Sequence, residues 1–112
     1  MSDAAVDVET GPDGSLIIQP HGALDMDDAV ELRRTLVHAV RHLRPMRLIL
    51  DLHDVSHLDP INLGTLAAAC HLGDDHAVAV FLDHSSQLIA DQLSAAGVAS
   101  HRLRHITHAS PV

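Results

Sequence analysis

Residues 47–64 read RLILDLHDVSHLDPINLG. Residues 47–52 form a near-continuous apolar run of strand length, which is typical of a central parallel strand that is covered on both faces. Asp59 and Pro60 then predict the start of a helix, because aspartate caps free backbone N–H groups and proline suits the first helical position. Residues 53–58, between this strand and this helix, are expected to form a loop.

The helix that begins at Pro60 is expected to include residues 61–72 and to end at Gly73, which readily takes the left-handed conformation of a helix end. Cys70 lies in its apolar stretch, where cysteine behaves as a small hydrophobic side chain. Another buried strand is predicted over residues 77–82. Strands and helices thus alternate, as they do around a mostly parallel sheet with right-handed crossovers.

A third helix is expected after Ser85 or Ser86, either of which can cap it, and Gly97 is expected to end it. Residue spacing predicts an inward face made of Leu88, Ile89, Leu93 and Ala96. Residues 98–107 fit either a last strand or a short helix.

The N-terminal part is predicted to form two short strands, over residues 5–9 and 15–19, around the turn Gly-Pro-Asp-Gly at 11–14. A long helix follows, which Asp25 or Asp27 can cap and which Pro45 stops. Three- and four-residue spacing predicts a buried face made of Ala29, Leu32, Leu36, Val40 and Leu43. The opposite face carries Arg33, Arg34, His38, Arg41 and His42. Such a basic face is more often a solvated helix face than a dock for an acidic partner.

Together these elements predict an α/β fold, a small sandwich of helices and a mixed, mostly parallel sheet of about four or five strands. The length of 112 residues favours one domain over residues 1–112. The single cysteine excludes an internal disulfide and fits a reducing cytoplasm. Because apolar runs are short and residues 1–11 are acidic, we expect a cytoplasmic protein without a signal peptide or membrane insertion.

Charge and composition argue against several classes of function. The formal net charge is −8 and Phe81 is the only aromatic residue of the Phe, Tyr and Trp type, so nucleic-acid binding is not expected. No glycine-rich phosphate loop is present, and Cys70 and His71 are neighbours in sequence that cannot face each other on a helix. We therefore expect neither an enzyme nor a cofactor.

Two groups of histidines are candidate metal sites by their spacing. The first joins His53, His57 and Asp59, with Asp51 and Asp54 close by. The second group consists of His101, His105 and His108, whose spacing would place them on one face of a helix. Side chains of a strand and a loop are expected to point in different directions, and histidine is common throughout this chain. No metal site is therefore expected.

Five short motifs carry a resemblance to a known family. They are HGALD at 21–25, LDL at 50–52, VSHLD at 55–59, LG at 63–64 and AAGV at 95–98. In this order and at these separations the chain resembles a STAS domain over about residues 5–107. The family includes bacterial anti-sigma-factor antagonists and the cytoplasmic ends of sulfate transporters. The resemblance implies the STAS fold and a regulatory role in binding another protein.

The resemblance also implies that the family carries a phosphorylation switch, and we expect this chain to lack it at the usual position. In the antagonists the matching helix opens with Asp-Ser-Ser-Gly-Leu-Gly or a close variant, and the anti-sigma factor, itself a serine kinase, phosphorylates the second serine. Here residues 59–64 read DPINLG, so Ile61 stands at the acceptor position and has no hydroxyl. The nearest hydroxyls belong to Ser56 and Thr65, and Thr65 is expected to bond a backbone carbonyl of its own helix.

The resemblance implies that the partner-binding surface lies at the start of the second helix. The end of the strand that precedes the first helix is expected to lie nearby. Its predicted residues are Asp25, Asp59, Pro60, Ile61, Asn62, Leu63 and Gly64. Ile61 is either a packed residue or an exposed contact residue. The expected partner is an anti-sigma-factor serine kinase. The alternative is an accessory or scaffold subunit of a membrane lipid transporter or a stress-signalling complex.

Overall fold

A computed structural model describes residues 6–107 of the chain. Its strands are β1 (Val6–Thr10), β2 (Leu16–Pro20), β3 (Gly22–Leu24), β4 (Arg47–Asp51), β5 (Val55–Leu58), β6 (Ala79–Asp83) and β7 (Leu103–Arg104). Its α-helices are α1 (Ala29–His38), α2 (Pro60–Asp75) and α3 (Gln87–Ala95). These elements confirm the predicted α/β fold.

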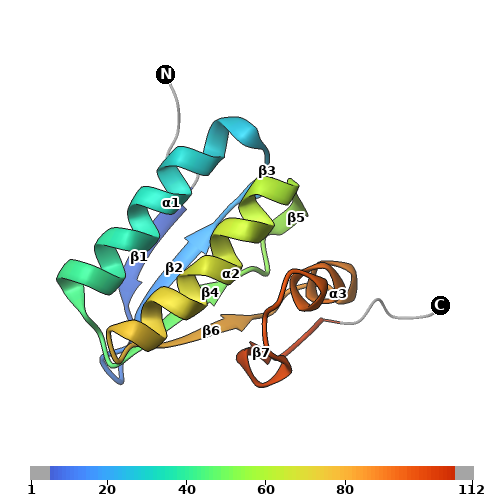
Figure 1. The fold of residues 1–112 in the computed structure, drawn as a ribbon. Coiled ribbons are helices and arrows are strands. Elements are labelled where there is room, and N and C mark those ends of the chain that lie inside the picture. The colour runs from blue at the N-terminus through green and yellow to red at the C-terminus, as the bar shows by residue number, and fades with distance from the viewer. Residues whose placement is uncertain (1–5, 108–112) are drawn as a thin grey trace.

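The main sheet has five strands in the order β1-β2-β4-β6-β7. β1 and β2 pair antiparallel around the predicted turn, and the remaining neighbours pair parallel. Side chains alternate across such a sheet, so one face carries the fully buried Ile18, Leu50 and Leu82. Helices α1 and α2 lie side by side over this sheet, and α3 lies beyond α2 (Figure 1).

A second sheet, of two strands, was not predicted. β3 and β5 pair parallel, with Leu24 opposite Leu58. The expectation of a loop over 53–58 was therefore wrong. Val55 and Leu58 are buried while the side chains between them are exposed, and this anchors the short strand in the core. β3 leads to α1 and β5 leads to α2, so the small sheet joins the starts of the two helices (Figure 1).

Gly73 does not end α2, contrary to the prediction. The helix continues to Asp75, and a Cβ atom at Gly73 would come within 2.6 Å of the Val78 carbonyl oxygen and of a Val80 methyl group. Glycine is required here because the helix approaches the following strand closely. Gly97, by contrast, follows α3 with a φ of 105°, as expected for a helix end.

Three side chains predicted to face the core are exposed instead. Leu43 is 52% exposed because the first helix changes to a π-helical segment over Ala39–Leu43, which turns its last residues away from the predicted face. The segment ends at Arg44, in left-handed conformation, directly before Pro45. On α3, Leu88 is 68% exposed and Ala96 is also exposed, while Ile89 and Leu93 are buried.

The C-terminal segment combines the two alternatives left open by the sequence. Residues Ser100–Arg102 form a 3₁₀ turn, and β7 then adds to the edge of the sheet beside β6. Arg104 on β7 lies over the Phe81 ring, 4.3 Å from its centroid, and binds both carboxylate oxygens of Asp83 at 2.8 Å. Ser86, rather than Ser85, caps α3 by accepting a hydrogen bond from the Ile89 N–H. No helix within residues 6–107 is long and apolar enough to cross a membrane.

Candidate functional site

The start of α2 is held by the cap that the sequence predicts. The Asp59 carboxylate accepts a hydrogen bond from the Ile61 N–H at 3.2 Å, and Pro60 occupies the first turn. The Asp59 N–H itself donates to the Leu24 carbonyl at 2.9 Å, which ties the helix start to the end of β3. The first turn of α2 is therefore fixed to the neighbouring strand as well as to its own cap.

Asn62 reinforces this connection from inside the protein. Its side chain is fully buried, and its Nδ2 group donates to the carbonyls of Leu24 at 2.9 Å and Asp25 at 2.8 Å. Both groups belong to the segment that leads into α1. Of the residues predicted to bind a partner, Asn62 thus positions the surface and its side chain does not reach it.

Asp25 caps the beginning of the other helix. Its carboxylate accepts from the Asp27 N–H at 2.9 Å, and its own N–H donates to Asp28 at 3.1 Å, which forms a capping box around the turn Met26–Asp28. This selects Asp25 from the two predicted caps. α1 continues directly from that turn.

The surface of this site is partly apolar. Ile61 is 47% exposed, so it is not a packed core residue and its side chain is accessible at the surface. Pro60 and Gly64 are also exposed, and a Cβ atom placed on Gly64 would meet nothing within 4 Å. Thr65, one turn after Ile61, donates its hydroxyl hydrogen to the Ile61 carbonyl at 3.0 Å, as expected. Ser56 is exposed on β5.

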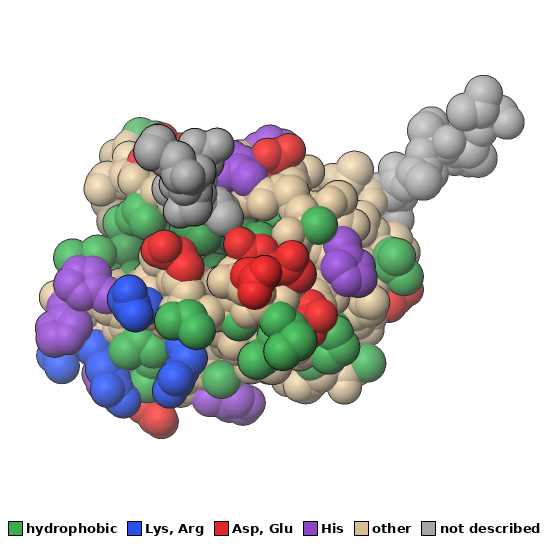
Figure 2. Space-filling view, turned by 90° about the horizontal axis from the view of Figure 1, so that it is seen from above, with side chains coloured by type: hydrophobic (Ala, Val, Ile, Leu, Met, Phe, Trp, Pro, Cys, Tyr) green, Lys and Arg blue, Asp and Glu red, His purple; other side chains and the backbone are tan. Residues whose placement is uncertain are grey.

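A groove extends from this surface between α1 and α2. It has a volume of about 580 Å³ and includes Arg33, Val37 and Arg41 of the first helical segment and Ile61, Ala68 and Leu72 of α2. Figure 2 shows arginine side chains gathered around hydrophobic ones at the left of the view, while most of the acidic side chains lie nearer the centre. The sequence predicts the basic face of the first helix, but it does not predict that apolar side chains of α2 lie beside that face.

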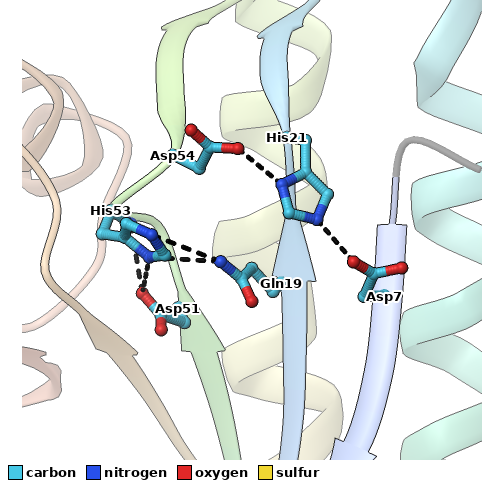
Figure 3. Close-up of polar contacts among 6 residues, drawn as sticks. All are labelled: Asp7, Gln19, His21, Asp51, His53 and Asp54. Atoms are coloured by element: carbon cyan, nitrogen blue, oxygen red, sulfur yellow. Dashed lines mark hydrogen bonds and ion pairs between the residues drawn. The ribbon is translucent and has the colours of Figure 1, made fainter.

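A polar cluster on the adjoining strand ends was missed by the sequence reasoning. His21 lies between two carboxylates, with Nδ1 at 2.6 Å from Asp54 and Nε2 at 2.7 Å from Asp7 (Figure 3). Hydrogen bonding to Asp54, and secondly to Asp7, raises the pKa of His21 above its ordinary value. The sequence separations of these residues gave no signal of the arrangement, because it depends on how β1, β2 and the β4–β5 connection meet.

The two candidate histidine groups do not form a metal-binding cluster within the described residues. His53 binds Asp51 at 3.0 Å and lies beside Gln19 (Figure 3). His57 is exposed on β5, and Asp59 is the helix cap. His101 lies in the 3₁₀ turn, and His105 follows β7 and stacks on His84. His108 lies outside the described residues. Within residues 6–107 no three His, Cys, Asp or Glu side chains are grouped as a metal site requires.

The buried cysteine also has an assigned place. Cys70 is in the core, and burial raises the pKa of its thiol. This keeps the thiol protonated and lowers its reactivity, in agreement with the prediction of a small hydrophobic residue.

The chain matches the profile of a known family over residues 5–107, and its description is "STAS domain". No curated protein matches the chain significantly. Among solved structures, an anti-sigma factor antagonist from Mycobacterium paratuberculosis is similar with a TM-score of 0.76 at 21% identity, over 96% of this chain and 92% of that one. The Bacillus cell fate determinant SpoIIAA, in its phosphorylated form, gives 0.74 at 16% identity over 95% and 92%. A sulfate transporter family protein from Wolinella succinogenes gives 0.72 at 19% identity over 88% and 82%.

Proposed function

Because this chain belongs to the STAS domain family, we propose that it is a regulatory binding protein of the anti-sigma-factor antagonist type. It binds an anti-sigma factor of the serine-kinase class in the bacterial cytoplasm and thereby releases the sigma factor. The observation that carries this proposal is the start of α2, where a rigidly held first turn presents an exposed Ile61. The similarity to the mycobacterial antagonist supports the same role.

Binding explains this surface better than catalysis does. Its polar side chains are occupied in holding the backbone, as Asp59 and Asn62 are, and its exposed part consists of Pro60, Ile61 and Gly64. An apolar patch beside a helix start can exclude water from an interface, but it supplies neither a nucleophile nor a general base.

We further propose that the protein lacks the phosphorylation switch at this site. Ile61 stands where the antagonists carry the acceptor serine, and a phosphoryl group cannot be transferred to a side chain without a hydroxyl. In the antagonists, phosphorylation would add a charge of about −1.5 to −2 at the helix start. The isoleucine therefore keeps the protein in its binding state unless another residue is modified.

The partner itself is tested by co-purification. The tagged protein is expected to capture an anti-sigma factor encoded in the source genome, and I61D is expected to lower the affinity at least tenfold by placing a carboxylate in the apolar contact. L88D is the matched control, since Leu88 is also an exposed apolar side chain but lies on α3. Failure to capture any anti-sigma factor would contradict the antagonist role.

The switch is tested by kinase treatment of the wild type and I61S, followed by mass spectrometry. We expect no phosphate on the wild type and phosphorylation of I61S at position 61, since that position is exposed and its N–H is already capped. Poor phosphorylation of I61S would reflect Pro60 and Asn62, which stiffen the approach. Stoichiometric phosphorylation of the wild type on Ser56 or Thr65 that abolishes partner binding would overturn this proposal.

A second function is an accessory or scaffold subunit of a lipid transporter or a stress-signalling complex. The similarity to the Wolinella sulfate transporter family protein favours it, and the missing hydroxyl suits a role that needs no phosphorylation. Gene neighbourhood discriminates between the two functions. Kinase and sigma-factor genes support the antagonist, while permease and ATPase genes support the subunit.

A further inference from the structure

The groove between α1 and α2 combines an apolar floor with free positive charge. Val37 and Leu72 are half-buried on its two sides, and Ala68 leaves the space between them open. Arg33 and Arg41 are exposed, and neither guanidinium forms an ion pair with any residue from 6 to 107. Arg47, by contrast, forms an ion pair with Asp13. The two groove arginines are therefore available to a ligand.

The spacing of these residues sets the shape of a suitable ligand. Arg33, Val37 and Arg41 recur every four residues and all line the groove, so they form one stripe along α1 and the π-helical segment that follows it. Ile61, Ala68 and Leu72 form the matching stripe of α2. The two helices lie side by side (Figure 1), and the residues that line the groove extend along α2 from Ile61 to Asp75. An elongated segment such as a helix fits this form better than a compact ligand.

Charge selects the kind of helix. The protein as a whole carries a formal charge of −8, so most of its surface repels acidic partners. The α1 side of the groove differs from the rest of the surface because it carries Arg33 and Arg41. On the α2 side, Asp75 at the end of the helix is acidic. An apolar helix stripe with carboxylates directed to the α1 side would fill the floor and pair both arginines. A basic helix would meet two unpaired guanidinium groups.

We propose that the α1–α2 groove docks an acidic amphipathic helix of a partner protein, with its carboxylates on Arg33 and Arg41. This proposal rests on the proposed binding function, because Ile61 belongs both to the groove and to the start of α2. It adds the chemistry of the partner segment. Helices commonly bind by placing an apolar face into such a groove, with charge fixing their orientation.

The test begins with a displayed library of helical 16-residue peptides, selected against the wild-type protein. Enriched peptides are expected to carry an apolar stripe flanked by carboxylates about two turns apart. R33A and R41A are each expected to weaken these peptides several-fold, and the double variant at least tenfold. Raising the salt concentration should weaken binding to the wild type more than to the double variant, because salt screens the charge pairs.

R44N is the matched control. Arg44 is exposed, lies outside the groove and has a φ of 46°, which asparagine tolerates, so the variant removes one positive charge without disturbing the backbone. Its peptide affinity is expected to stay within twofold of the wild type. Circular dichroism and the thermal midpoint should be unchanged in all variants, because the substituted side chains are exposed.

Several results would overturn the proposal. If the selected peptides carry no acidic residues, the groove does not recognise negative charge. The same conclusion follows if acidic peptides bind R33A/R41A as tightly as they bind the wild type. Self-association that R33A/R41A abolishes would assign the groove to a second copy of the chain. Binding to phosphatidylglycerol vesicles in place of peptides would assign it to a lipid surface.

The same variants separate this proposal from the proposed function. If the captured anti-sigma factor binds R33A/R41A normally but not I61D, the antagonist role stands and the groove proposal fails. If acidic peptides bind the groove but no anti-sigma factor is captured, the groove proposal stands and the antagonist role fails.

Discussion

His21 shows how one residue can make this fold depend on pH. Each ring nitrogen lies within 2.7 Å of a carboxylate oxygen, from Asp7 on one side and Asp54 on the other. A neutral imidazole has a single N–H and can donate to only one of them. The protonated ring can donate to both, and it thereby joins β1 to the connection between β4 and β5.

We therefore predict that H21Q destabilises the protein at low pH more than at high pH. The pKa of His21 is raised in the folded state, so its stabilisation is complete below the unfolded value of about 6.5 and is lost as pH rises through the folded value. Urea denaturation of wild type and H21Q at pH 6 and pH 9 measures the difference in free energy of unfolding. A difference that does not shrink between these pH values contradicts the prediction, and H57Q controls for the loss of an exposed histidine.

At the scale of elements, the side-chain caps of α2 and α3 each accept one backbone N–H bond but differ in position. Asp59 caps α2 beside the predicted partner surface, and Ser86 caps α3 away from it. Both bind one backbone N–H at 3.2 Å. The pair can therefore separate the stability of a helix from the shape of the binding surface.

Both D59A and S86A are predicted to lower the free energy of unfolding by about 1 kcal/mol, the usual cost of a lost cap. Only D59A is expected to weaken partner binding or to slow phosphorylation of I61S. Denaturation curves and pull-down from the same preparations provide the two measurements. Equal losses of binding in both variants would mean that global stability, and not the first turn of α2, controls the interaction.

At the scale of the whole molecule, Arg102 attaches the C-terminal segment to the rest of the protein. It donates to the Val80 carbonyl at 3.0 Å and to both oxygens of Asp74, at 2.7 and 2.8 Å. It therefore connects the 3₁₀ turn to β6 and to the end of α2. The Arg102 side chain is only 13% exposed, so these bonds are largely shielded from water on its side.

We predict that R102A lowers the free energy of unfolding by about 2 kcal/mol, since hydrogen bonds to charged groups contribute more than neutral ones. Hydrogen exchange at Leu103 and Arg104 should accelerate in the variant. R34A is the control, because Arg34 is an exposed arginine with no hydrogen bond among the described residues. If R102A lowers the free energy of unfolding no more than R34A does, the Arg102 hydrogen bonds contribute little to stability.

The sequence predicts those features that depend on local chemistry. The β1–β2 turn, the apolar strands and the cap at Asp59 all follow from neighbouring residues, and the cap of α3 was narrowed to Ser85 or Ser86. β3 and β5 were not predicted, because each is very short and pairs with its neighbouring strand only in the folded chain. Gly73 was misread because a glycine that admits a close strand has the same sequence signal as one that ends a helix.

The candidate site divides in the same way. The start of α2 was predicted from contiguous residues, and its exposed Ile61 was one of two alternatives left open. The groove was not predicted, because it joins stripes of two helices whose spacing across the gap no local pattern reveals. His21 likewise depends on residues from three separate segments.

The order of the strands in the main sheet has a consequence for how the protein is made. Because β1, β2, β4, β6 and β7 lie in the sheet in the order in which they leave the ribosome, no later strand has to insert between two that have already paired. Each strand can add to the growing edge, and the unpaired backbone groups at that edge are the aggregation risk at every stage. In the folded protein, charged side chains and a short edge strand protect the two edges of the sheet from aggregation. β1 has acidic side chains at Asp7 and Glu9, and β7 is only two residues long and bears Arg104.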